Sequence, residues 1–118
     1  MEVRAYARHI PMSAQKVRRV VDLVRGMDVE SALEMLRFMP NAAARPVEKV
    51  VRSAMANAEE NAGLSRDNLY IAAITADEGA GVMPGKGRRP RFGGRGRYRP
   101  IRKRSSHITV VLDELSEE

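Results

Sequence analysis

The residues with the clearest chemical potential are the arginines and lysines of residues 84–104. This range holds ten Lys or Arg, eight of them Arg, together with five Gly, three Pro and no acidic residue. Arginine presents a planar fork of N–H donors that matches the geometry of a phosphate. Phe92 and Tyr98 lie among the arginines, where their rings could stack on unpaired bases or pair across a hairpin. The range therefore predicts contact with a polyanion, and nucleic acid is the leading candidate.

Charge is distributed unevenly along the chain. The 118 residues carry 21 basic and 15 acidic side chains, which gives a net charge of +6. Ten of the basic residues fall in residues 84–104, so the remainder holds 11 basic against 15 acidic residues, a balance of −4. We therefore expect a mildly acidic body that carries one intensely basic segment. A charge run that only aids solubility is the alternative, and the lack of any acidic residue in the segment argues against it.

Composition also excludes several classes of protein. The sequence has no apolar run long enough to span a membrane, and its first residues do not resemble a signal peptide. It contains no cysteine, so disulfides and thiolate metal sites are excluded, which is compatible with a cytoplasmic protein. We expect no membrane partner.

Catalytic and metal-binding patterns are weak. His9 and His107 are the only histidines, and neither lies in a spaced cluster with carboxylates, so a zinc site is not expected. Ser105–His107 could suggest a nucleophile, but a strand histidine that bonds backbone or RNA is favoured. Asp77–Glu78 would point to opposite faces of a strand and cannot act as an acid–base pair. Gly85–Gly87 lacks the Ser or Thr of a nucleotide-binding loop. We therefore expect no enzymatic activity, no cofactor and no small-molecule substrate.

The elements that must position the basic segment can be predicted from local patterns. Ser13 is a candidate N-cap and Gly26 a candidate stop for a first helix, whose outer face is largely basic. Asp28 is a candidate N-cap for a second helix, which Pro40 ends. A longer third helix follows, and three segments read as strands. The predicted strands are residues 2–10, 69–76 and 107–114, and the third helix is residues 42–62.

These elements predict an α+β fold, with three helices packed on a small three-stranded antiparallel sheet and a long protruding basic β-hairpin. We expect one domain over residues 1–118, with a body at residues 1–79 and 105–118 and an arm at residues 80–104. If Asp77 pairs with His107, the arm is centred on residue 92, and its tip holds Arg91, Phe92 and Arg95. Such an arm would reach about 50 Å at roughly 3.3 Å per residue. We expect it to become ordered against a polyanion.

Four separated motifs make the prediction more specific. They are "MSAQKVRRVVDLVRG" (12–26), "SAMANAEENAG" (53–63), "ADEG" (76–79) and "KRSSHITVVL" (103–112). Together they closely resemble the bacterial-type large-subunit ribosomal protein family numbered twenty-two, over about residues 3 to 113. The resemblance implies a body on the solvent side of the large subunit. It also implies a hairpin that threads through the large rRNA, lines the nascent-peptide exit tunnel and aids subunit assembly.

The resemblance and the basic composition together define the expected RNA-binding residues. The implied partners are large-subunit rRNA, neighbouring large-subunit ribosomal proteins and the nascent peptide at the hairpin tip, in a cytoplasmic ribosome. One departure from the family pattern is the uncharged stretch at residues 80–85, which leaves open which residue reaches the tunnel constriction. The expected RNA-binding residues are Ser13, Lys16, Arg18, Arg19, Arg25, Asn57, Asn61, Lys86, Arg88, Arg89, Arg91, Phe92, Arg95, Arg97, Tyr98, Arg99, Arg102, Lys103, Arg104, Ser105, Ser106 and His107.

Two readings of function remain, and they differ in class. The leading one is a structural, non-enzymatic rRNA-binding protein whose binding energy comes from charge neutralisation and counterion release. The alternative is a free regulatory RNA-binding module or RNA chaperone that uses its Gly-Arg arm without a ribosome. The alternative predicts broad and weak binding to many RNAs.

Overall fold

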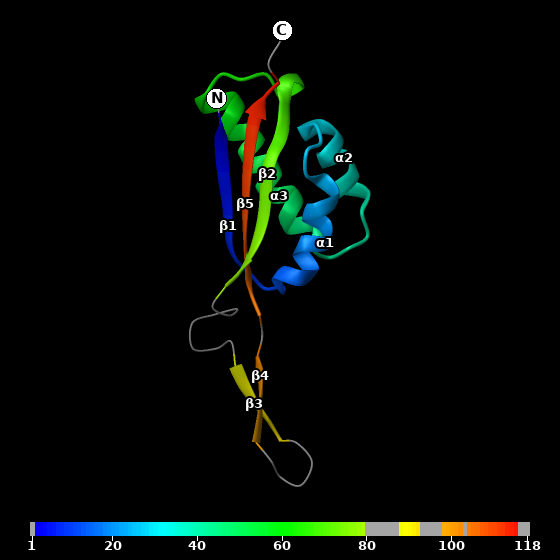
Figure 1. The fold of residues 1–118 in the computed structure, drawn as a ribbon, viewed down its shortest axis with the longest axis vertical. Coiled ribbons are helices and arrows are strands. Elements are labelled where there is room, and N and C mark those ends of the chain that lie inside the picture. The colour runs from blue at the N-terminus through cyan, green and yellow to red at the C-terminus, as the bar shows by residue number, and fades with distance from the viewer. Residues whose placement is uncertain (1, 80–87, 93–97, 103, 116–118) are drawn as a thin grey trace.

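Three helices cover one face of a three-stranded sheet, and a two-stranded ribbon extends from one end of that sheet (Figure 1). The computed structural model describes residues 2–79, 88–92, 98–102 and 104–115, and it gives residues 88–92 and 98–102 by their backbone. The molecule measures 68 × 25 × 19 Å, and its radius of gyration is 17.4 Å. A compact chain of this length would have a radius of gyration of about 13 Å. The predicted α+β class with a protruding hairpin is confirmed.

The sheet consists of β1 (Val3–Ile10), β5 (Ser106–Glu114) and β2 (Leu69–Glu78), in that order and all antiparallel. Buried and half-buried residues alternate along β5, as expected for a strand with one covered face. Asp77 pairs with His107, so the predicted register of the two strands that lead into the arm is confirmed.

The helices are α1 (Ala14–Val24), α2 (Val29–Phe38) and α3 (Ala44–Asn61), followed by the short 3₁₀ turn η1 (Arg66–Asn68). Ser13 caps α1, since its side-chain oxygen accepts the Lys16 N–H at 3.4 Å. Gly26 follows the helix with a φ of +82°, a conformation that favours glycine. Asp28 precedes α2 as predicted, but its side chain makes no capping hydrogen bond.

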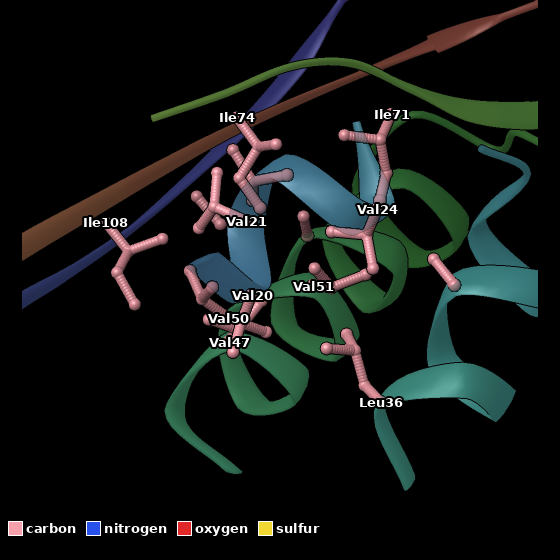
Figure 2. Close-up of a cluster of buried hydrophobic side chains, with 14 of the residues drawn as sticks. Val20, Val21, Val24, Leu36, Val47, Val50, Val51, Ile71, Ile74 and Ile108 are labelled. Atoms are coloured by element: carbon pink, nitrogen blue, oxygen red, sulfur yellow. The ribbon is translucent and has the colours of Figure 1, made fainter. Parts of the chain in front are cut away.

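The core lies between the helices and the inner face of the sheet (Figure 2). Branched aliphatic side chains dominate the core. They recur along each helix and strand at the spacing that places them on the inward face of the element. Burial of such side chains is the main force that holds the three helices on the sheet. The labelled side chains come from α1 (Val20, Val21, Val24), α2 (Leu36), α3 (Val47, Val50, Val51), β2 (Ile71, Ile74) and β5 (Ile108).

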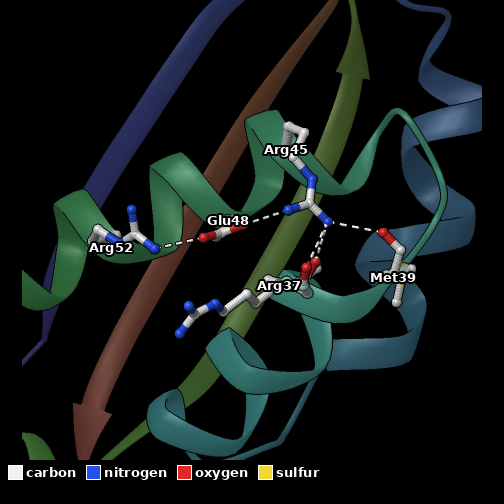
Figure 3. Close-up of polar contacts among 6 residues, drawn as sticks. Arg37, Met39, Arg45, Glu48 and Arg52 are labelled. Atoms are coloured by element: carbon white, nitrogen blue, oxygen red, sulfur yellow. Dashed lines mark hydrogen bonds and ion pairs between the residues drawn. The ribbon is translucent and has the colours of Figure 1, made fainter.

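A guanidinium group joins the end of α2 to the start of α3 (Figure 3). Arg45 Nη2 donates to the carbonyl oxygens of Leu36, Arg37 and Met39 at 2.6, 3.1 and 2.8 Å. Its Nη1 also pairs with the Glu48 carboxylate at 3.2 Å. Carbonyls at a helix C-terminus lack partners within the helix, so Arg45 supplies the donors that α2 needs at its end.

The ribbon is formed by β3 (Arg88–Phe92) and β4 (Tyr98–Arg102). Phe92 pairs with Tyr98, which centres the hairpin on residue 95 rather than on residue 92. The expectation that Arg91 and Phe92 form the tip was therefore wrong, because both lie within β3. The two sides of the arm differ in length. Arg88 lies ten residues after Glu78 on the outgoing side, whereas Ser106 lies four residues after Arg102 on the returning side. These six extra residues move the centre by three positions.

Candidate nucleic-acid interface

The β3–β4 ribbon brings like charges into register. Arg88 lies opposite Arg102, and Arg91 lies opposite Arg99. Directly opposed like charges destabilise an antiparallel pair, so this ribbon suits an environment that supplies negative charge. Phe92 and Tyr98 are also opposed in the backbone register, and both stacking on bases and pairing across the ribbon remain open for them. The remaining expected arm residues, Lys86, Arg95, Arg97 and Lys103, lie outside the described residues.

Arg18 of α1 and Arg25, which directly follows that helix, are directed at the edge of the sheet. Arg18 Nε donates to the Ala76 carbonyl, and Arg25 Nη2 donates to the Ile74 carbonyl, each at 2.9 Å. Strand β2 is an edge strand, and its outward carbonyl groups need partners that the sheet does not supply. Arg18 and Arg25 therefore close the edge of β2, and their contact with RNA remains a prediction.

Other expected residues of the body lie at different places. Lys16 and Arg19 are exposed on α1, close in sequence to the Ser13 cap. Asn57 is half-buried and Asn61 is exposed, one turn apart at the C-terminal end of α3. That end is followed by η1 and the start of β2, where Leu69 pairs with Glu114 at the far end of the sheet from the arm. The structure does not gather the two asparagines with the residues at the base of the arm.

The polar residues at the base of the arm are closely packed and do not form an open, exposed cluster. Ser105 and Ser106 are buried, with 1% and 0% of their surface exposed, while His107 is half-buried and Arg104 is exposed. The Gly79 N–H donates to the Ser105 carbonyl at 3.0 Å. A Cβ on Gly79 would lie 2.4 Å from Ser105 Oγ and 3.2 Å from two atoms of the His107 ring. Glycine is therefore required where β2 leaves the body.

The outer face of the sheet groups the expected residue His107 with Tyr6, Arg8 and His9, which were not among the expected RNA-binding residues. The backbone N–H of His9 donates to His107 Nδ1 at 3.1 Å, and the two rings meet edge to face with centroids 5.0 Å apart. Arg8 places its guanidinium carbon 5.8 Å from the centre of the Tyr6 ring. The Tyr6 hydroxyl, followed by Glu2, raises the pKa of Arg4. The available signal was the alternation Arg-x-Tyr-x-Arg in residues 4–8, which sets three side chains on one face of a strand.

The described part of the chain contains neither a candidate metal site nor a candidate membrane-spanning helix. No group of three or more His, Asp or Glu side chains there could hold a metal ion. No helix among the same residues is both long enough and apolar enough to cross a bilayer.

The chain is similar to known proteins along nearly its whole length. The model of the family described as "Ribosomal protein L22p/L17e" matches residues 5–113. "Large ribosomal subunit protein uL22" of Cutibacterium acnes is 52% identical over 109 residues, which are 92% of this chain and 68% of that protein. The proteins of the same name from Thermoanaerobacter sp. and Thermoanaerobacter pseudethanolicus are each 50% identical over 114 residues, 97% of this chain and 98% of each relative. The chain therefore belongs to the L22p/L17e family, whose members are structural, non-enzymatic proteins of the large ribosomal subunit.

Proposed function

We propose that this chain binds large-subunit rRNA and that its basic arm runs between rRNA segments. The observation that carries the proposal is the register of β3 and β4, which sets Arg88 opposite Arg102 and Arg91 opposite Arg99. A two-stranded ribbon is marginally stable in water even without such repulsion. Phosphate groups on both sides would neutralise these charges, and the released counterions would supply binding energy. The arm is thus suited to nucleic acid on both of its sides.

The body and the arm would have separate roles in this binding. Several arginines of the body are engaged within the fold: Arg18 and Arg25 with β2, Arg45 with α2, and Arg66 with the Glu59 carboxylate at 2.8 Å. The body without the arm also carries a net negative charge of −4. We infer that the body docks by shape, as proteins do on folded RNA, and that the arm provides most of the electrostatic attraction.

The arm is also proposed to line the nascent-peptide exit tunnel and to aid subunit assembly. Its direction supports this, because the ribbon continues along the long axis of the sheet, away from the helices (Figure 1). From Ser106 to Tyr98 the chain runs eight residues, a reach of about 26 Å at roughly 3.3 Å per residue. The hairpin centre at residue 95 falls within residues 93–97, which are the proposed contact for the nascent peptide.

Neighbouring ribosomal proteins are the proposed second class of partner, and α2 offers a surface for them. Phe38 and Met35 are 75% and 42% exposed, and they line an apolar pocket of about 540 Å³ together with Met39, Ser31 and Glu34. Exposed large apolar side chains grouped in this way are typical of protein contacts. Glu34 lines the same pocket and the Arg37 guanidinium lies 5.8 Å from the centre of the Phe38 ring, so the surface offers a protein partner both signs of charge beside its apolar side chains.

The proposal is tested by removing the arm. Residues 84–102 are deleted, and the two ends that remain are joined by a short Gly-containing turn. The deletion variant and the parent chain are each titrated with large-subunit rRNA across a range of salt concentrations. We expect the shortened chain to remain folded and to bind rRNA with a clearly shallower salt dependence. The slope falls by about 0.7–0.9 for each phosphate contact that is lost.

Two outcomes would count against this division of roles. An unchanged salt slope would mean that the arm does not contact phosphates. A folded body that has lost all rRNA binding would favour the free RNA-binding module. The tunnel contact is tested separately with a photo-crosslinking residue in place of Arg95 in assembled ribosomes. It should form adducts with a stalled nascent chain, and adducts with rRNA alone would contradict that contact.

A further inference from the structure

We propose that the outer face of the sheet, at the base of the arm, binds one unstacked nucleotide of RNA in a pocket between β1 and β5. The base would stack on Tyr6 and the adjoining phosphate would contact Arg8. The inference rests on the proposed RNA-binding function and adds a site that the arm does not contain. The pocket measures about 340 Å³ and is lined by Tyr6, Arg8, His9, His107, Ile108 and Thr109.

The backbone of β1 is distorted at this pocket. His9 adopts a φ of +58°, and it is the only residue other than glycine in the described part of the chain with a positive φ. The pairing of β1 with β5 shifts register between Ala7 and Ile10, so β1 bulges at this point. A left-handed conformation is costly for residues other than glycine and tends to persist where a site requires it. Here it aims the His9 N–H at the ring of His107.

That hydrogen bond fixes the tautomer of the neutral His107 ring. Because His107 Nδ1 accepts the His9 N–H at 3.1 Å, a neutral His107 ring carries its proton on Nε2. Nε2 and the neighbouring ring carbon lie against the position of Gly79, at the root of the arm. The edge-to-face contact with His9 holds both rings in place. The two histidine rings therefore form one wall of the pocket whose orientation is fixed before RNA binds.

Arg8, the arginine that lines the pocket, lies on its β1 side. Arg4, Tyr6 and Arg8 alternate along β1 and so project from the same face. Arg8 approaches the Tyr6 ring, whereas Arg4 lies outside the pocket lining and pairs with Glu2 at 3.5 Å. On the other side, the exposed Asp77 is paired with His107 and would repel a phosphate. This asymmetry places the phosphate on the β1 side and the base toward β5.

A single-stranded nucleotide fits this arrangement better than a duplex does. Proteins that bind unpaired RNA combine an aromatic ring, on which a base stacks, with nearby cations for the backbone. Tyr6 is 56% exposed, so its ring is available for stacking without unfolding β1. A pocket of about 340 Å³ is at the lower end of small-ligand sites, which suits one nucleotide and not a helix.

The chain provides a matched control on the same sheet. Tyr70 lies on β2 and pairs with Asp113, whereas Tyr6 lies on β1 and pairs with Thr109. Since residues that pair directly share a face, both tyrosines belong to the outer face of the sheet. The neighbours of Tyr70 include carboxylates, and those of Tyr6 include arginines. Tyr6→Ala removes a tyrosine ring that lies beside arginines, and Tyr70→Ala removes a tyrosine ring that lies beside carboxylates.

The experiment uses the full-length chain bound to large-subunit rRNA, with affinity measured for the variants Tyr6→Ala, Tyr6→Val, Tyr6→Phe and Tyr70→Ala. We expect Tyr6→Ala and Tyr6→Val to bind about tenfold more weakly, the effect of losing one stacked base. Val suits a strand, so it separates loss of the ring from loss of strand stability. Tyr70→Ala should bind as the parent chain does, and Tyr6→Phe should restore most of the affinity that Tyr6→Ala loses, because it keeps the ring. Ultraviolet crosslinking of the parent complex should join the peptide that contains Tyr6 to an unpaired nucleotide.

Three outcomes would overturn the inference. One is equal affinity for Tyr6→Ala and Tyr70→Ala, and another is a crosslink from Tyr6 only to base-paired RNA. The third is a crosslink from Tyr6 to a protein in intact subunits. Failure of the parent chain to bind rRNA would overturn both this inference and the proposed function. A shallower salt slope on arm deletion, with Tyr6→Ala unchanged, would retain the function and remove only the nucleotide pocket.

Discussion

Replacing Arg45 by Ala is expected to lower the free energy of unfolding by about 2 kcal/mol. The physical reason is the loss of the donors that satisfy the end of α2. In the parent chain one guanidinium nitrogen bonds three carbonyl groups, of Leu36, Arg37 and Met39, and the other nitrogen bonds Glu48 (Figure 3). Alanine at the same position leaves α3 intact, because it is itself a strong helix former.

The magnitude follows from the geometry. A hydrogen bond to a charged group contributes about 1.5–3 kcal/mol, and a cation at a helix C-terminus contributes about 0.3–1 kcal/mol. Arg45 has 51% of its side chain exposed, so water screens these interactions and can hydrate part of what is lost. Glu48 keeps its second partner, Arg52, at 2.5 Å. The total is therefore far below the sum of four separate bonds and comes to about 2 kcal/mol.

Urea denaturation of the full-length chain, followed by circular dichroism, measures this loss directly. For a chain of this size, the midpoint of thermal unfolding should fall by about 6–8 °C. Arg37→Ala is the control, since among the described residues this side chain makes a contact with the Phe38 ring and no ion pair. Arg45→Lys should recover about half of the loss, because a lysine keeps the charge but not the fork of donors.

The reasoning would be refuted by a loss for Arg45→Ala below about 0.5 kcal/mol, the range of ordinary surface substitutions. Equal losses for Arg45→Ala and Arg37→Ala would refute it as well. The first result would mean that solvent satisfies the end of α2 as well as Arg45 does, and the second that the carbonyl contacts of Arg45 add nothing beyond an arginine near this helix end.

Two further predictions concern the base of the arm and the surface of α2. Gly79→Ala should cost about 1–3 kcal/mol of stability by overpacking against Ser105, and the double variant with Ser105→Ala should recover part of it in the same urea assay. No recovery would place the strain elsewhere. Phe38→Ser should change stability by less than about 0.5 kcal/mol, because the side chain is 75% exposed, yet reduce incorporation into reconstituted large subunits. Normal incorporation would contradict α2 as a protein-binding surface.

Much of the fold could be predicted from local patterns. The helix starts after Ser13 and Asp28 are confirmed, and so is the pairing of Asp77 with His107. The helix starts depend on neighbours within a few residues, and the pairing follows from placing two consecutive strands antiparallel, so no knowledge of the core packing was needed. The position of the hairpin centre could not be predicted in this way. A count from Asp77 and His107 assumes two equal sides, and six extra residues on the outgoing side broke that assumption.

By itself, the sequence determined the charge of the proposed partner, because a segment with ten cations and no acidic residue attracts a polyanion in any fold. Only the tertiary structure decided which cations the fold itself uses. Arg18 donates to the carbonyl of Ala76, 58 residues further along the chain, and the His9 N–H donates to the ring of His107, 98 residues further along. Composition carries no information about such contacts, since they arise when packing of the helices and strands brings distant segments together. For the same reason, the pocket between Tyr6 and His107 became visible only once β1 and β5 were paired.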